Sequence, residues 1–127
     1  MAKQIVRTEN APVPVAPYSQ ATIANGIIFT AGQLGTRPGQ PGLIEGGIQA
    51  ETRQALENIR AVLEAAGSSM ANVLKVTVFL DDINDFAAMN EIYGQYFTEN
   101  HPARSAFEVS KLPLGGKVEI ETVALVE

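Results

Sequence analysis

The sequence contains no cysteine, a single histidine and no long hydrophobic run. Without cysteine the chain can form no disulfide, no thiolate nucleophile and no cysteine–zinc site. His101 stands before Pro102 with no partner motif, so we expect no metal site. No apolar stretch approaches the roughly 20 residues that a membrane-spanning helix needs, and the first residues lack the apolar core of a signal peptide. We therefore expect no membrane partner and a cytoplasmic location.

Positive charge is also scarce. The 9 Lys and Arg residues oppose 14 Asp and Glu residues, giving a net charge of −5, and the basic residues do not cluster. Proteins that bind nucleic acids neutralise phosphates with basic patches, so we expect no nucleic-acid partner. A small anionic ligand remains open, because one well-placed arginine can hold a carboxylate.

With 127 residues the chain is long enough for one domain with a single hydrophobic core, spanning residues 1–127. Asn25-Gly26 between two apolar runs predicts a two-residue hairpin turn, because both turn positions need positive φ. The apolar periodicity predicts two helices and three further strands. The helices are expected at 48–66 and 83–97, and the strands at 72–80, about 104–110 and 117–126. The order strand, hairpin, helix, strand, helix, strand, strand predicts an α+β domain.

The first predicted helix is amphipathic, with Leu56, Ile59 and Leu63 on its apolar face and Glu51 and Glu57 turned away. Two helices can cover only one face of the sheet, yet strand 72–80 is apolar on both faces. A second copy of the chain is the simplest cover for the other face, so we expect an oligomer.

Arg104 is the first candidate for chemistry. In an alternating strand it shares a face with Ala106 and Glu108. It either pairs with a surface carboxylate or uses the space beside Ala106 to bind a ligand carboxylate with its two-pronged guanidinium.

Glu119, in the last strand, either points to solvent or lies on a half-buried oligomeric face, where a raised pKa would suit a general acid or base. Asn90 lies on the apolar side of the second helix and could simply satisfy a buried backbone group; Tyr18 could simply pack. If the last two strands formed a hairpin, Glu119 would lie about 13 Å from Arg104. A site that contains both therefore needs another strand arrangement or a neighbouring chain.

Several stretches taken together resemble the Rid family of reactive-intermediate (enamine/imine) deaminases, also called the YjgF family. The resemblance runs over nearly the whole chain, as a single Rid-type domain, and its middle and last segments are the most specific in combination. The matching stretches are "APYSQ" (16–20), "FTAGQLG" (29–35), "QALENIRAVLEAAG" (54–67), "KVTVFLDDINDFAAMNEIYGQYF" (75–97), "PARSAFEVSKLP" (102–113) and "VEIETVA" (118–124).

The resemblance implies a chorismate-mutase-like fold, with a mixed β-sheet and two helices on one face, assembled as a homotrimer with clefts between subunits. It implies hydrolysis of 2-imino acids, such as 2-iminobutanoate and 2-iminopropanoate, to 2-keto acids and ammonia without a cofactor. By the same resemblance, Arg104 would bind the substrate carboxylate and Glu119 would activate the attacking water. The residues expected to line or shape the cleft are Tyr18, Gly32, Asn90 and Ala106.

Two residues depart from the pattern of the family. Rid deaminases commonly have Ser before the Gly of "SGQ" and Cys two residues after the Arg, where this chain has Ala31 and Ala106. These changes bear on substrate choice more than on reaction type. Two other functions stay open: a non-catalytic module that binds a 2-keto acid or similar carboxylate through Arg104, and an RNA-cleaving translation inhibitor, which the acidic charge disfavours.

Overall fold

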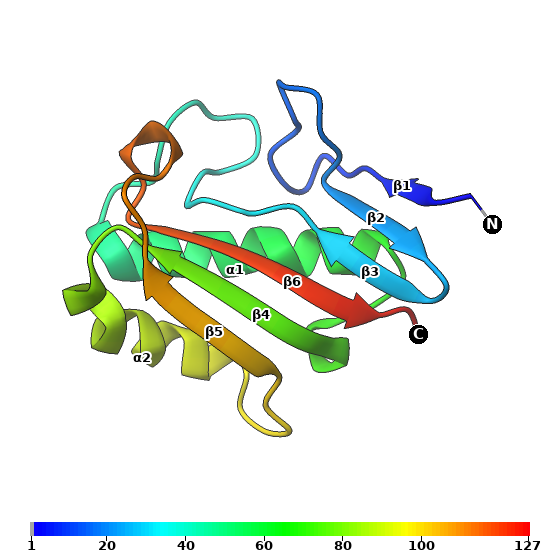
Figure 1. The fold of residues 1–127 in the computed structure, drawn as a ribbon. Helices are drawn as coiled ribbons and strands as arrows, with labels where there is room; N and C mark the ends of the chain where they lie inside the picture. The colour runs from blue at the N-terminus through cyan, green and yellow to red at the C-terminus, as the bar shows by residue number, and fades with distance from the viewer. Residues whose placement is uncertain (1) are drawn as a thin grey trace.

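The computed structural model describes residues 2–127 as a six-stranded sheet with two helices against one face (Figure 1). The elements are β1 (Gln4–Val6), β2 (Ala21–Ala24), β3 (Ile27–Thr30), α1 (Gly47–Ala65), β4 (Val73–Leu80), α2 (Phe86–Tyr96), β5 (Ala103–Glu108) and β6 (Val118–Leu125). The α+β class and the order of elements predicted from the sequence are confirmed. The sequence assigned no residues to the first strand, which the structure places at β1.

The hairpin turn between β2 and β3 is the one predicted. Asn25 and Gly26 have φ values of 52° and 77°, and β2 and β3 pair antiparallel on either side of them. The second helix begins later than expected, because a 3₁₀ turn at Ile83–Asp85 precedes α2. Within residues 2–127, no helix is long and apolar enough to cross a membrane.

The strand order is β1-β2-β3-β6-β4-β5, so β4 lies between the last two strands of the chain. β4 and β5 run parallel, and all the other neighbours pair antiparallel. A parallel pair needs a crossover connection, and α2 provides it between β4 and β5. β5 and β6 therefore do not pair with each other, which answers the question of strand arrangement that the sequence left open.

The hydrophobic core lies between the sheet and the two helices, which Figure 1 shows behind the same face. Each strand contributes alternate side chains to it, as the period of two requires. The largest fully buried apolar side chains are Ile28, Leu56, Ile59, Val62, Leu63, Val76, Val78, Leu80, Met89, Val118 and Ile120.

The other face of the sheet carries no helix, as predicted. It presents Ile5, Phe29, Phe107 and Leu125, whose side chains are between 43% and 57% exposed. Phe107 contacts Phe79 of β4 on this face, with their ring centroids 5.3 Å apart. Large apolar side chains gathered on one open face are typical of a surface that another molecule covers.

Candidate functional site

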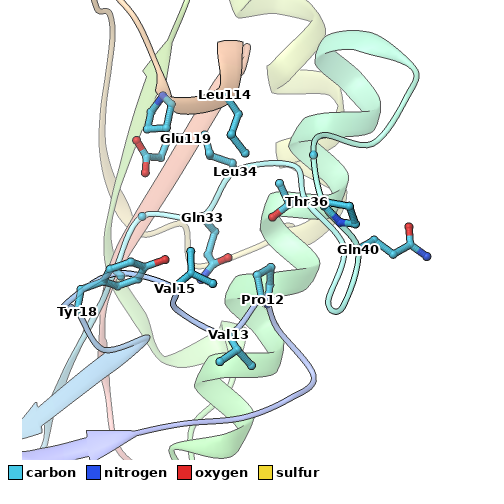
Figure 2. A pocket seen from close by; sticks show the side chains of 15 residues that line it. Pro12, Val13, Val15, Tyr18, Gln33, Leu34, Thr36, Gln40, Leu114 and Glu119 are labelled. Atoms are coloured by element: carbon cyan, nitrogen blue, oxygen red, sulfur yellow. The ribbon is translucent and has the colours of Figure 1, made fainter.

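A pocket of about 660 Å³ lies beside the end of the sheet where β6 begins. Figure 2 shows Pro12, Val13 and Val15, from the segment between β1 and β2, lying across this pocket from Leu114 and Glu119. Its lining is mostly apolar, with a few polar groups, as in binding pockets for small molecules. The lining residues are Pro12, Val13, Val15, Tyr18, Ala31, Gly32, Gln33, Leu34, Thr36, Gln40, Pro41, Gly42, Pro113, Leu114 and Glu119.

Glu119 provides the carboxyl group of this pocket. It alternates with the buried residues Val118 and Ile120 of β6, so its side chain lies on the face of the sheet opposite the helices. Burial raises the pKa of Glu119 above the ordinary value for glutamate, and the negative charge of Glu121 raises it further. A carboxyl group with a raised pKa is suited to take up and return a proton near neutral pH.

Gly32 lies directly against the Glu119 carboxylate. A Cβ atom built on Gly32 would come within 2.5 Å of the Glu119 Oε2 atom and 2.8 Å of its Cδ atom. Ordinary contacts of such an atom are 3.4–4 Å, so any side chain at position 32 would displace the carboxylate. The glycine is therefore needed for close approach at this position.

The backbone around Glu119 and Gly32 is tied together by hydrogen bonds. The Gln33 N–H donates to the Ile120 carbonyl over 2.8 Å, and the Ile120 N–H donates to the Gln33 carbonyl over 3.0 Å. This reciprocal pair fixes the segment that carries Gly32 alongside the first residues of β6. The positions of the two residues relative to each other are therefore set by backbone, not by side-chain packing alone.

The prediction that Glu51 points away from the core is wrong. Glu51 is only 4% exposed, and its Oε1 atom accepts a hydrogen bond from the Lys117 N–H over 2.8 Å. Lys117 directly precedes β6, so a carboxylate of α1 holds the start of the strand that carries Glu119. A charged side chain can be buried in this way because it accepts a backbone donor that would otherwise lack a partner.

Asn58, two turns further along the same side of α1, holds the wall of the pocket. Its side-chain amide donates to the Thr36 carbonyl over 2.8 Å and to the Leu34 carbonyl over 3.3 Å. Its own oxygen accepts from Gln54 over 2.9 Å. Together, Glu51 and Asn58 connect α1 to both segments that flank Glu119.

Arg104 lies on the helix side of the sheet, away from this pocket. Its Nη1 atom donates to the Asn90 Oδ1 atom over 2.6 Å, and its guanidinium carbon lies 4.6 Å from the centre of the Tyr93 ring and 5.3 Å from that of Phe86. These partners come from α2 at the spacing i, i+4 and i+7, which places them on one helix face. The structure therefore brings Asn90 and Arg104 together.

The alternative that Arg104 pairs with a surface carboxylate is not observed. Glu108, its neighbour on β5, instead accepts the Ile83 N–H over 3.0 Å. Within residues 2–127, the one ion pair closer than 4.0 Å joins Arg60 and Glu57. The charge of Arg104 is thus not neutralised by any carboxylate in the described part of its own chain.

The predicted site residues fall into two groups within one chain. Tyr18, Gly32 and Glu119 line the pocket, whereas Ala106, packed against the core, accompanies Asn90 and Arg104 on the helix side. Glu119 is level with Phe107 across β4, three residues along from Arg104 and two strands away. Spacings of about 3.3 Å per residue and about 4.8 Å per strand put their backbones about 14 Å apart. One chain therefore does not bring the two groups together.

Phe86 and Tyr93 lie on the same side of α2 as Asn90, but the sequence did not predict that they lie beside Arg104. Their spacing relative to Asn90 was the available signal, because it places all three on the same helix face. Burial raises the pKa of the Tyr93 hydroxyl, and the nearby positive charge of Arg104 opposes that rise.

In the described residues, no group of three His, Asp or Glu side chains could hold a metal ion.

Known proteins are similar to this chain over nearly its whole length. Residues 8–126 match the family described as Endoribonuclease L-PSP. The chain is 53% identical over 125 residues to a RutC family protein of Pyrococcus horikoshii, covering 98% of this chain and 99% of that protein. It is 46% identical over 125 residues to the human 2-iminobutanoate/2-iminopropanoate deaminase, covering 98% of this chain and 91% of that protein.

The fold also matches a solved structure whose sequence is about as similar to this chain as that of the human protein. The crystal structure of YyfA from Yersinia pestis, a protein of the conserved Rid family, superposes on this chain with a TM-score of 0.93. The two sequences are 45% identical, and the superposition covers 98% of this chain and 100% of that one.

Proposed function

The chain belongs to the Rid (YjgF) family, and we propose that it hydrolyses reactive 2-imino acids, such as 2-iminobutanoate and 2-iminopropanoate, to 2-keto acids and ammonia. The name of the human relative supports this activity. The observation that carries the proposal is the state of Arg104, which is hydrogen-bonded to Asn90 but has no carboxylate partner within residues 2–127. Its positive charge is therefore available to a carboxylate ligand, which a guanidinium binds with two parallel hydrogen bonds.

The proposed reaction adds water across the C=N bond and then releases ammonia. Water attacks C2 of the imino acid, and Glu119 accepts a proton from the water and passes it to the imine nitrogen, which gives a carbinolamine. Glu119 then takes the proton of the new hydroxyl group and delivers it to the nitrogen as the C–N bond breaks, so that the carbonyl forms and ammonia leaves. Arg104 holds the substrate carboxylate throughout, so that C2 stays in place. We propose that no cofactor takes part, because this hydrolysis transfers no electrons. The residues proposed to line the site are Tyr18, Gly32, Asn90 and Ala106.

We propose that each site is formed between two copies of the chain in a homotrimer. One copy would supply Arg104, Asn90 and Ala106, and its neighbour would supply Glu119 and the pocket around it. The separation of about 14 Å within one chain supports this arrangement, as do the apolar side chains on the open face of the sheet. A closed ring would repeat the same head-to-tail contact and form one site at each interface.

Cleavage of RNA is a weaker alternative, because a chain with a net charge of −5 repels a polyanion. The cytoplasmic location expected from the sequence stays a prediction.

The test is an assay in which a threonine dehydratase generates 2-iminobutanoate in the same solution. Formation of 2-ketobutyrate and ammonia should exceed the spontaneous rate in proportion to the amount of protein added. A calorimetric titration with 2-ketobutyrate should be run in parallel. Binding of this ligand without any acceleration would contradict the enzymatic proposal and favour the carboxylate-binding module instead.

A further inference from the structure

The guanidinium of Arg104 lies near two aromatic rings of α2. Its central carbon is 4.6 Å from the centre of the Tyr93 ring and 5.3 Å from the centre of the Phe86 ring. Both distances are within the range of about 6 Å at which a cation is attracted to the face of an aromatic ring. We call these two side chains the aromatic cradle.

We propose that the aromatic cradle, Phe86 and Tyr93, positions Arg104 for carboxylate binding and so sets the affinity of the site for its ligand. This inference rests on the proposed function, in which Arg104 binds the substrate carboxylate. Neither ring is assigned contact with the substrate, so both are positioning residues.

The groups that hold the Arg104 guanidinium are neutral, and this leaves its charge free for a ligand. An Asp or Glu beside Arg104 would also fix the guanidinium, but it would compete with the ligand for the same charge. The aromatic cradle and the Asn90 amide oxygen restrict the side chain while leaving its net charge uncompensated. A restricted guanidinium loses less conformational entropy when it binds a carboxylate, and a planar group is the one that stacks well on rings.

The contribution of Tyr93 comes from its ring and not from its hydroxyl. The Tyr93 hydroxyl is buried and has no hydrogen-bond partner among the described residues. An unsatisfied buried hydroxyl lowers stability, so Tyr93→Phe should melt at the same temperature as the parent or higher. Because Tyr93→Phe keeps the ring, it should also keep the affinity for ligand.

α2 offers a matched control in Tyr96. The ring of Tyr96 lies 5.0 Å from the guanidinium carbon of a different arginine, Arg60, and its hydroxyl donates to Glu57. Tyr96→Leu thus removes a tyrosine from the same helix, and a contact of the same kind, without removing a ring from Arg104.

The experiment measures the dissociation constant for 2-ketobutyrate, and KM and kcat for 2-iminobutanoate, in the parent and in four variants. Tyr93→Leu and Phe86→Leu should raise the dissociation constant and KM by about 3- to 30-fold. Their kcat should change much less, because loss of an anchor for both substrate and transition state appears mainly in KM. Tyr93→Phe and Tyr96→Leu should keep the parent affinity.

Three results would overturn the inference. Parent affinity in Tyr93→Leu and Phe86→Leu would show that the rings do not matter. An equal loss in Tyr93→Phe would assign the effect to the hydroxyl, and an equal loss in Tyr96→Leu would assign it to general packing of α2. If Tyr93→Leu does not fold, the less buried Phe86→Leu decides the outcome. A parent protein that neither binds 2-ketobutyrate nor hydrolyses the imine would instead refute the proposed function itself.

Discussion

Replacing Gly32 by alanine should impair catalysis far more than folding. The new Cβ atom would lie 2.5 Å from Oε2 of Glu119, where an ordinary contact is 3.4–4 Å. The backbone at position 32 does not have the positive φ that disfavours other residues, so alanine is compatible with the main chain. The carboxylate, at the end of a rotatable side chain, is the group that must move.

The size of the effect follows from this distance. Restoring an ordinary contact displaces the carboxylate by about 1 Å, and a misplacement of about 1 Å in a catalytic group can cost about 100-fold in rate. The free energy of unfolding should change by less than about 1 kcal/mol, because a half-exposed carboxylate can rotate without opening a cavity. Gly32→Ala should therefore lower kcat/KM by about 100-fold while its melting temperature stays close to that of the parent.

The control is Gly94→Ala on α2. A Cβ atom at Gly94 meets nothing within 4 Å, and alanine is favoured over glycine inside a helix by about 0.8–1.0 kcal/mol. This variant should be slightly more stable than the parent and equally active on dehydratase-generated 2-iminobutanoate. If Gly32→Ala kept the kcat/KM of the parent, the placement of the Glu119 carboxylate would not matter and its role as the base would be refuted.

Substitutions at three further residues test other parts of the structure. Arg104→Ala should lower kcat/KM by roughly 30- to several thousand-fold. Arg104→Lys should restore little of this activity, because an ammonium group cannot reproduce the proposed two-pronged contact with a carboxylate. A lysine variant as active as the parent would refute that contact. The raised pKa of Glu119 means that its charged form destabilises the folded state. Glu119→Gln should therefore unfold at the same or a higher denaturant concentration than the parent at pH 7. This gain in stability should disappear below the ordinary pKa of glutamate, where the Glu119 carboxyl of the parent is protonated in both the folded and the unfolded state. A gain in stability that grew as the pH fell would contradict this reasoning. Glu51→Ala should cost about 1–3 kcal/mol, because the Lys117 N–H loses its acceptor, and faster exchange of that amide proton should accompany the loss.

Local features of the fold could be predicted because neighbouring residues determine them. The hairpin turn follows from the positive φ that Asn25 and Gly26 adopt easily, and both helices follow from apolar residues at three- and four-residue spacing. The prediction that Arg104 and Ala106 lie on the same face of their strand was also correct.

Features set by distant residues could not be predicted in the same way. Glu51 looks like a surface charge on a helix, and only its hydrogen bond to a residue 66 positions away explains why it is buried. The insertion of β4 between β5 and β6 depends on how the whole sheet assembles, and it decides that Arg104 and Glu119 point to opposite faces. The sequence could state the condition for a shared site, but not that the strand arrangement leaves Arg104 and Glu119 apart within one chain.

The central claim, a hydrolytic site shared between copies of the chain, can be tested by mixing two inactive variants. Arg104→Ala and Glu119→Gln chains would be unfolded together in equal amounts, refolded, and assayed for ammonia release from 2-iminobutanoate. If each site takes Arg104 from one copy and Glu119 from the next, random mixing leaves both residues intact in about one site in four, so about a quarter of the parent activity should return. Native mass spectrometry would verify that mixed oligomers had formed. Mixed oligomers with no more activity than either variant alone would contradict the account.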